Sequence, residues 1–386
     1  MPSRFPAGLR GQLAAFSFSR MILNTGFRMV YPFLPAIARG LGLDLATAAL
    51  AVTARSATGL ASPLLGFLAD RFGPKLAMLA GLLTFAFGLA LVFAWPTFTS
   101  LVIGLCLSAI AKVLFDPSMQ AYLGDRVRYE QRGLAIAITE FGWSGAFLLG
   151  MPIVAWLIAR GGWSAPFPFL AGLALVATAV LWRLLPADDR PSRGSLSPLK
   201  GLRIILARPS AVAMLGVGLL ASAGNEAVSI VYGAWLEQSF GLEILALGAA
   251  SAIVGLAELC GEGLVASFSD RIGKRRATLL GLGLNSLASI ALPLTGPSIG
   301  AAFLGLFAFY FTFEFTLVSA IPLLTEQVPE ARASMMASNV AALALGRSLG
   351  AFLGPQLLVA GLLANCLAAA AFDLLAMALL ALRVRE

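Results

Sequence analysis

Histidine is absent from this sequence, and charged side chains of every kind are scarce. Asp, Glu, Lys and Arg make up 12% of the 386 residues, whereas 59% of the residues are hydrophobic. Soluble domains carry about 25% charged residues, so the composition excludes an ordinary soluble fold and predicts a membrane protein. Without histidine, the chain lacks the commonest metal ligand and the side chain that titrates closest to neutral pH. Any proton chemistry must therefore use carboxylates.

Cysteine is also scarce, and Cys106, Cys260 and Cys366 each stand alone inside an apolar run. This spacing excludes a disulfide framework and a thiolate metal site. The sequence shows no nucleophile beside a base and no glycine-rich phosphate loop, and the Gly-x-x-x-x-Gly-Lys-Ser/Thr motif of ATP-driven pumps is missing. We therefore expect no enzyme activity, no metal and no cofactor.

Long apolar runs fill most of the chain. A helix needs about 20 residues to cross the hydrocarbon of a bilayer, and the runs are continuous, without the period-two alternation of a membrane β-barrel. The sequence therefore predicts an all-α membrane protein with twelve transmembrane helices. The predicted spans are 12–38, 46–69, 76–95, 99–125, 133–160, 165–185, 209–236, 244–268, 277–295, 298–325, 332–360 and 363–383.

Lysine and arginine are distributed unevenly between the loops. Of the 27 bases, five lie well inside predicted spans, two (Arg39 and Arg160) lie in one set of loops or at its edge, and 20 lie in the other set or at its edge, together with the termini. The positive-inside rule then predicts a multi-pass protein of the cell membrane with both termini in the cytoplasm. The bases flank the spans in short groups with no interleaved aromatic platform, which argues against a nucleic-acid partner.

The two halves of the chain carry matching landmarks at an offset near 200 residues. The pairs are GFLADRFGPK at 66–75 with SFSDRIGKRR at 267–276, YEQRGLA at 129–135 with PEARASM at 329–335, and GAFLLGMP at 145–152 with GAFLGP at 350–355. A segment rich in Pro, Ser and charge lies between the halves, as expected of a linker. We predict an N-terminal six-helix half at 1–185, a cytoplasmic linker at 186–208 and a C-terminal six-helix half at 209–386.

Ionisable residues inside the spans point to a site. Each costs at least about 2.5–3.5 kcal/mol at the bilayer centre unless it faces protein or water. Away from the ends of the spans, six lie in spans 1, 4, 7 and 10, and none lies in spans 3, 6 and 9. The alternative interpretation is that these charges pair inside the bundle for packing or gating. The full set away from the span ends is Arg20, Arg28, Arg55, Lys112, Asp116, Glu140, Glu226, Glu258, Glu262, Glu314, Arg347 and Asp373.

The stretch GFLADRFGPK resembles the loop 2–3 signature of the major facilitator superfamily, Gly-x-Leu-Ala-Asp-Arg-x-Gly-x-Lys/Arg, and SFSDRIGKRR resembles its weaker copy in loop 8–9. Two parallel six-helix repeats are the architecture of that family, whose substrate sites lie near the membrane midplane between the halves. The resemblance extends to the drug/proton antiporter branch. Here the sequence departs from the pattern, because the fourth-span arginine is missing and the fifth-span glycine signature is only loosely matched by GWSGAFLLGMP.

The resemblance implies gating roles for the loop residues. In the family, the loop aspartate and bases hold the cytoplasmic gate shut, and an aspartate in this place can also lie against the positive N-terminal end of a helix. The alternative is that these loops only set topology. The residues concerned are Gly66, Asp70, Arg71, Gly73 and Lys75 in the first copy, Asp270, Arg271 and Gly273 in the second, and Glu140, Glu258 and Arg347 as a gate between the halves.

Spacing selects the candidate binding residues. Arg20, Asn24 and Arg28 recur every four residues and form one polar stripe, and Lys112 and Asp116 share a face in the same way. The bases suggest an anionic or zwitterionic solute, and nearby aromatic residues suggest an amphipathic one. The predicted substrate-binding residues are Arg20, Asn24, Arg28, Lys112, Asp116, Asn225 and Tyr310, and the predicted proton-coupling residues are Glu226 and Glu314.

These observations predict a secondary active transporter that exports a small organic solute by alternating access, coupled to protons. It is expected to act as a monomer in the lipid bilayer. The alternatives are an uncoupled uniporter, a solute or anion exchanger, a lipid flippase and a membrane sensor that does not transport.

Overall fold

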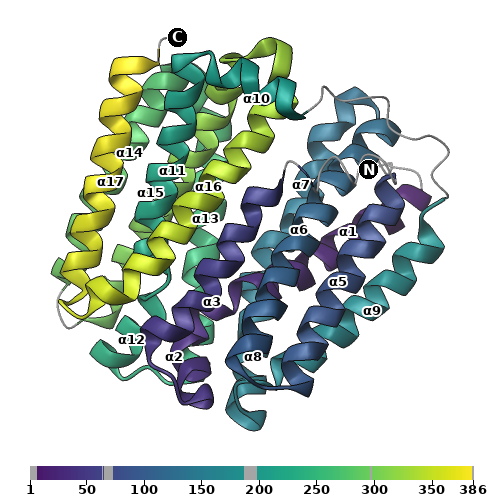
Figure 1. The fold of residues 1–386 in the computed structure, drawn as a ribbon, viewed down its shortest axis with the longest axis vertical. Helices are drawn as coiled ribbons and strands as arrows, with labels where there is room; N and C mark the ends of the chain where they lie inside the picture. The colour runs from purple at the N-terminus through teal and green to yellow at the C-terminus, as the bar shows by residue number, and fades with distance from the viewer. Residues whose placement is uncertain (1–6, 63, 65–72, 187–197, 296–297, 385–386) are drawn as a thin grey trace. The chain divides into compact units, whose positions relative to one another are not determined.

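A computed structural model describes residues 7–62, 64, 73–186, 198–295 and 298–384. Nearly all of these residues are helical and none of them forms a strand, which confirms the all-α prediction. The helices (Figure 1) are α1 (Ala7–Arg28), α2 (Val30–Leu41), α3 (Leu45–Ala57), η1 (Thr58–Ala61), α5 (Pro74–Ala94), α6 (Phe98–Arg126), α7 (Tyr129–Gly145), η2 (Ala146–Gly150), α8 (Met151–Gly161), α9 (Pro166–Leu184), α10 (Pro198–Leu206), α11 (Pro209–Ser229), α12 (Tyr232–Phe240), α13 (Ile244–Ile272), α14 (Lys274–Ala291), η3 (Leu292–Thr295), α15 (Ile299–Glu326), η4 (Pro329–Ala331), α16 (Arg332–Leu358) and α17 (Leu362–Arg383).

The helices follow the predicted spans. In the described residues, ten helical stretches are long and apolar enough to cross a membrane, and they coincide with the third to twelfth predicted spans. The shorter apolar helix Leu45–Ala61 lies in the second span. The first span is divided into α1 and α2 near Met29. Pro32 explains the division, because proline has no N–H to bond the carbonyl four residues earlier and so interrupts a helix.

The chain divides into two compact units. The first unit comprises Met1–Val30 and Leu64–Gly194, and the second comprises Tyr31–Pro63 and Ser195–Glu386. Residues 31–63 thus group with the C-terminal residues. The predicted division into two six-helix halves is based on a repeat in the sequence, whereas these units are defined by contacts between residues. The two six-helix halves therefore stay a prediction.

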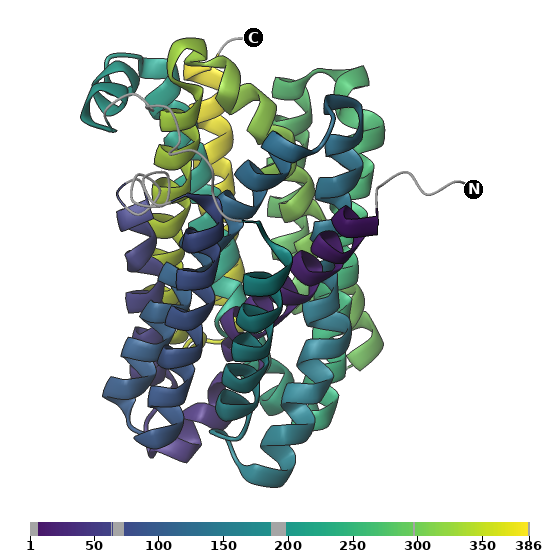
Figure 2. The same cartoon turned by 90° about the vertical axis from the view of Figure 1, so that its right-hand side faces the viewer.

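Small residues bring helices close together in the first unit. A Cβ added to Gly81 of α5 would lie 2.8 Å from the Ala111 carbonyl oxygen of α6, and one added to Gly88 would lie 3.1 Å from the Gly104 carbonyl oxygen. No side chain larger than hydrogen fits there, so α5 and α6 pack backbone against backbone. Helix α1 runs obliquely to its neighbours in this unit, as the purple ribbon in Figure 2 shows.

In the second unit, α11 packs against α16 and α17. Three glycines of α16 face α11 at four-residue spacing, which is the small-x-x-x-small pattern of close membrane helices. Cβ atoms added to Gly346 and Gly350 would lie 2.1 and 2.4 Å from carbonyl oxygens of α11, and one added to Gly354 would lie 2.3 Å from the Ile230 side chain. Close packing therefore accounts for these glycines.

Gly350→Leu is expected to lower the free energy of unfolding by at least about 1–3 kcal/mol, because overpacking a tight contact costs this much and the obstacle here is backbone. Thermal unfolding of the purified protein in detergent measures the loss. The matched control is Gly172→Leu in α9, because a Cβ at Gly172 meets nothing within 4 Å. Equal stability of the two variants would contradict the packing assignment.

The segment predicted as a linker contains a helix. Residues Pro198–Leu206 form α10, which packs against α11 and α16. Ile205 is fully buried in the hydrophobic core of the second unit. The helix begins at a proline, which suits the first turn because its missing N–H has no partner there. At least this part of the linker is therefore a packed element.

Candidate functional site

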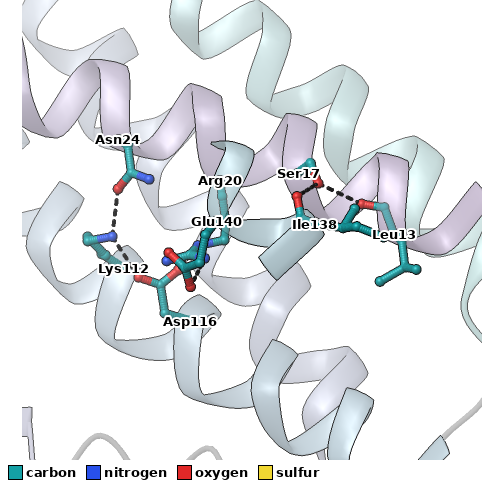
Figure 3. Close-up of polar contacts among 8 residues, drawn as sticks. All are labelled: Leu13, Ser17, Arg20, Asn24, Lys112, Asp116, Ile138 and Glu140. Carbon is teal, nitrogen blue, oxygen red and sulfur yellow. Dashed lines mark hydrogen bonds and ion pairs between the residues drawn. The ribbon is translucent and has the colours of Figure 1, made fainter. Parts of the chain in front are cut away.

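The first group of polar residues forms where α1 meets α7 and η2 in the first unit. Glycines permit this contact: a Cβ added to Gly142 would lie 2.5 Å from the Ser17 carbonyl oxygen, and one added to Gly150 would lie 2.1 Å from Thr25 Oγ1. The hydroxyl of Ser17 donates to the Ile138 carbonyl oxygen at 2.8 Å and joins the two elements (Figure 3). The segment Ala146–Gly150 is a π-helical turn, a feature often found at functional sites.

Five polar side chains converge here (Figure 3). Arg20 Nη1 donates to Glu140 Oε1 at 2.6 Å, and Arg20 Nε lies 3.3 Å from Asp116 Oδ1. Arg20 Nε and Asp116 Oδ1 form an ion pair but are not aligned for a hydrogen bond. Lys112 Nζ donates to Asp116 Oδ2 and to Asn24 Oδ1, each at 2.6 Å. Asp116 thus bridges two bases, and we name Arg20, Asn24, Lys112, Asp116 and Glu140 the charged cluster.

Arg28, the last residue of the predicted stripe, lies on aromatic rings. Its guanidinium carbon is 3.9 Å from the centroid of the Trp143 ring and 4.9 Å from that of Phe147. Lys112 Nζ lies 5.2 Å from the same Trp143 ring. All three distances fall in the range of cation–π attraction, which is strongest over tryptophan. The two predicted groups of bases, on α1 and α6, therefore share one aromatic residue.

The charged cluster is largely buried. The side chain of Arg20 is 6% exposed, those of Lys112 and Asp116 are 19% and 20% exposed, and that of Glu140 is 33% exposed. Asn24 is also buried, and its Nδ2 donor has no acceptor among the described residues. Buried polar donors are normally satisfied, so this amide is a candidate contact for a solute.

A second group lies in the second unit. Glu226 of α11 is 3% exposed, and its Oε1 accepts a hydrogen bond from the Tyr31 hydroxyl at 2.9 Å. The same hydroxyl oxygen accepts a hydrogen bond from Arg55 Nη2 at 2.6 Å. Arg55 of α3 is fully buried. The structure thus links one predicted proton-coupling residue to Tyr31 and Arg55, neither of which was among the predicted site residues.

The other predicted binding residues of this unit are joined by Ser229. The Tyr310 hydroxyl donates to Ser229 Oγ at 2.8 Å, and Ser229 Oγ donates to Asn225 Oδ1 at 3.2 Å. Asn225 Nδ2 is buried without an acceptor among the described residues. Glu314 is buried on α15. Sequence reasoning missed Ser229, although it follows Asn225 by one helical turn and that spacing was available as a signal.

The predicted gating residues are only partly described. Gly66, Asp70 and Arg71 lie outside the described residues, as do the side chains of Asp270 and Arg271. Gly73 and Gly273 both have φ of +87°, so the two copies of the motif use glycine for the same left-handed turn before a helix. Lys75 Nζ donates to the Leu185 carbonyl oxygen at 2.5 Å, at the end of α9.

The three residues predicted to gate between the halves lie on three different helices, α7, α13 and α16. Glu140 belongs to the charged cluster of the first unit. Glu258 is buried on α13, and Arg347 is half-buried on α16. Among the described residues, no ion pair of Arg347 is found. Their gating role stays a prediction.

Comparison with known proteins decides the family. The sequence model of the Major Facilitator Superfamily matches residues 16–355. The chain belongs to the major facilitator superfamily. It is 25% identical over 287 residues to the MFS-type transporter YceJ of Bacillus subtilis, covering 74% of this chain and 73% of YceJ. Multidrug resistance protein 1 of the same organism is 27% identical over 236 residues, covering 60% of each chain.

Solved structures agree on the fold. The nucleoside transporter NupG superposes with a TM-score of 0.79 at 15% identity, covering 98% of this chain and 100% of NupG. This likeness shows the fold alone. The protein is therefore a multi-pass transporter of the cell membrane with the major facilitator fold, and this family and fold are those of transporters and not of enzymes.

Proposed function

We propose that this transporter exports a small organic solute that carries negative charge, alone or with a positive or apolar part, in exchange for protons. The class of solute is inferred from the balance of positive and negative side chains around α1. Arg20 and Lys112 pair with the carboxylates of Asp116 and Glu140, and Arg28 lies over the same Trp143 ring as Lys112, so bases outnumber carboxylates by one among these five residues. An anionic group would neutralise that excess in surroundings where an unbalanced charge is expensive.

The aromatic rings beneath Arg28 support an amphipathic solute. Trp143 and Phe147 lie within cation–π distance of the guanidinium, and an arginine packed on aromatic rings can also donate its N–H groups to a carboxylate or a similar acceptor. The unpartnered Nδ2 of Asn24 supplies a further donor one helical turn away. A solute with an acidic group beside an apolar body fits this arrangement of donors and rings.

Proton coupling rests on the carboxylates, because the chain has no histidine. Glu226 is the strongest candidate, since it is buried and bonded to a hydroxyl that a buried arginine also contacts. A carboxylate whose partners change between two conformations changes its proton affinity, which is what coupling requires. Export is favoured by the likeness to multidrug resistance protein 1, and the distribution of the loop bases predicts that both termini lie in the cytoplasm.

An uncoupled exchanger is the second candidate. Arg55 lies next to Tyr31, and a positive charge that stayed beside Glu226 in both conformations would keep the carboxylate ionised throughout. Flux into proteoliposomes, measured with and without an imposed pH gradient, separates the two functions. A solute that moves equally fast under both conditions would support the exchanger.

Arg28→Ala is expected to weaken binding of an organic carboxylate about 10-fold or more and to leave binding of its neutral methyl ester little changed, because only the carboxylate loses a charge-assisted contact. Binding of a fluorescent pair of such compounds measures the difference. The matched control is Arg160→Ala, which removes an exposed arginine 4.5 Å from the Trp156 ring. Equal loss for acid and ester would reject the anion site.

A further inference from the structure

Tyr31 and Arg55 form a directed chain of hydrogen bonds to Glu226. A guanidinium can only donate, so the Tyr31 oxygen accepts from Arg55 and the single hydroxyl proton is left for the Glu226 carboxylate. Tyr31 also lies with its ring centroid 5.2 Å from the Arg55 guanidinium carbon. The direction of both bonds is therefore fixed by the chemistry of the three groups.

This chain of hydrogen bonds favours the ionised form of Glu226. A hydrogen bond donated to a carboxylate is stronger than one donated to a neutral carboxyl group, and a donor that is itself polarised by an arginine is stronger still. Arg55 is itself fully buried, so its positive charge acts on this group of contacts with little screening by water. A positive charge close to a carboxylate favours the ionised form, so Arg55 too favours a negative Glu226.

Other charged or titratable residues surround α11 in the described part of the second unit. On α15, Tyr310 donates to Ser229, one turn from Glu226. On α16, Arg347 lies one turn before Gly350, where a Cβ would be 2.7 Å from Glu226 Cβ. Further groups on these elements include Arg39 of α2, which pairs with Glu237 of α12, Glu314 and Glu326 of α15, and Cys366, Asp373 and Arg383 of α17.

We propose that Tyr31 and Arg55 are the positioning residues of the proton site at Glu226. This proposal rests on the proposed proton coupling and names the residues that would set the proton affinity of Glu226. The two residues come from α2 and α3, whereas Glu226 comes from α11. The hydrogen-bond chain exists only while these helices pack together, so Glu226 releases its proton in this packing and binds one when the helices separate. Differential proton affinity between two packings is the thermodynamic requirement for coupling.

The test is the pH dependence of Glu226 labelling by dicyclohexylcarbodiimide, which reacts with protonated carboxyl groups in apolar surroundings. Mass spectrometry of the peptide that contains Glu226 measures the labelled fraction in the purified protein, without any need for a solute. Tyr31→Phe is expected to move the pH of half-labelling upward by about 1 unit or more, because the ionised form loses a hydrogen bond. Arg55→Gln should move the pH of half-labelling in the same direction. Arg55→Lys keeps the positive charge and should therefore cause a smaller shift than Arg55→Gln.

Tyr232→Phe is the matched control, because Tyr232 is a buried tyrosine of the same unit whose hydroxyl lies 3.2 Å from Ser251 Oγ. It should leave the half-labelling pH unchanged. A Tyr31→Phe curve that superposes on that of the wild type would overturn the role of the hydrogen-bond chain and leave proton coupling standing. Labelling of Glu226 that does not depend on pH in the wild type would instead remove both proposals. Tyr31→Phe keeps the ring, so folding is expected to survive.

Discussion

Glu226→Gln is expected to abolish accumulation of solute driven by a pH gradient and to leave solute counterflow partly intact. Glutamine keeps the size of the side chain and an oxygen that can accept from Tyr31, but it cannot bind and release a proton. Transport that depends on the proton is lost, while the conformational change that exchanges one solute molecule for another remains. Flux into proteoliposomes under an imposed pH gradient, compared with counterflow at equal pH, measures the two activities.

Two further variants make this result specific. Glu314→Gln tests the second predicted proton carrier in the same way, because Glu314 is also buried. Glu237→Gln is the control, since Glu237 forms an ion pair with Arg39 whose side chain is 58% exposed. Accumulation by both the Glu226 and the Glu314 variants when only a pH gradient is imposed would show that neither carboxylate couples transport to protons.

The helices were predictable from the sequence because a bilayer sets their length and composition. An apolar run of about 20 residues specifies a membrane helix almost independently of its partners. The division of the first span depends on Pro32, a local feature that the sequence displays. Helix α10 was missed because its nine residues lie within a segment whose composition is that of a linker, and its helical state depends on packing Ile205 into the core.

The charged cluster was predictable only in part. Lys112 and Asp116 are four residues apart on one helix, so their contact follows from helical geometry. The contact of Arg20 with Glu140 spans 120 residues and depends on how α7 packs against α1. Glycines at 142 and 150 permit that approach, but a glycine does not specify which helix will fill the space beside it.

Arg55 shows a different limit. The sequence displays it as one arginine inside an apolar run, which predicts a partner but cannot name one. Its partner Tyr31 lies 24 residues earlier, and Glu226 lies 195 residues from Tyr31. No helical spacing connects residues on three helices, so this group emerges only from the folded chain. The loop motif is the converse case, because its pattern was evident in the sequence while Asp70 lies outside the described residues. Its gating role stays a prediction.

Asp116→Ala is expected to lower the free energy of unfolding by about 3–5 kcal/mol, because removing one member of a buried ion pair leaves the other charge uncompensated. Arg20 would retain Glu140 at 2.6 Å. Lys112 would retain the Asn24 carbonyl oxygen and the Trp143 ring but would lose the carboxylate described for its ammonium. The loss of stability is therefore expected to come mainly from the uncompensated charge of Lys112. Thermal unfolding in detergent, followed by the intrinsic fluorescence of tryptophan, measures it.

A pair of further variants separates charge from packing. Asp116→Leu alone should be as unstable as Asp116→Ala, because Lys112 is again left without its carboxylate. Lys112→Met combined with Asp116→Leu removes both charges and keeps their approximate volume, and such replacements of a whole buried pair are often neutral or stabilising. The double variant should therefore recover most of the stability that the single variant loses. A double variant as unstable as Asp116→Leu would mean that packing around Asp116, rather than an unpaired ammonium, accounts for the loss.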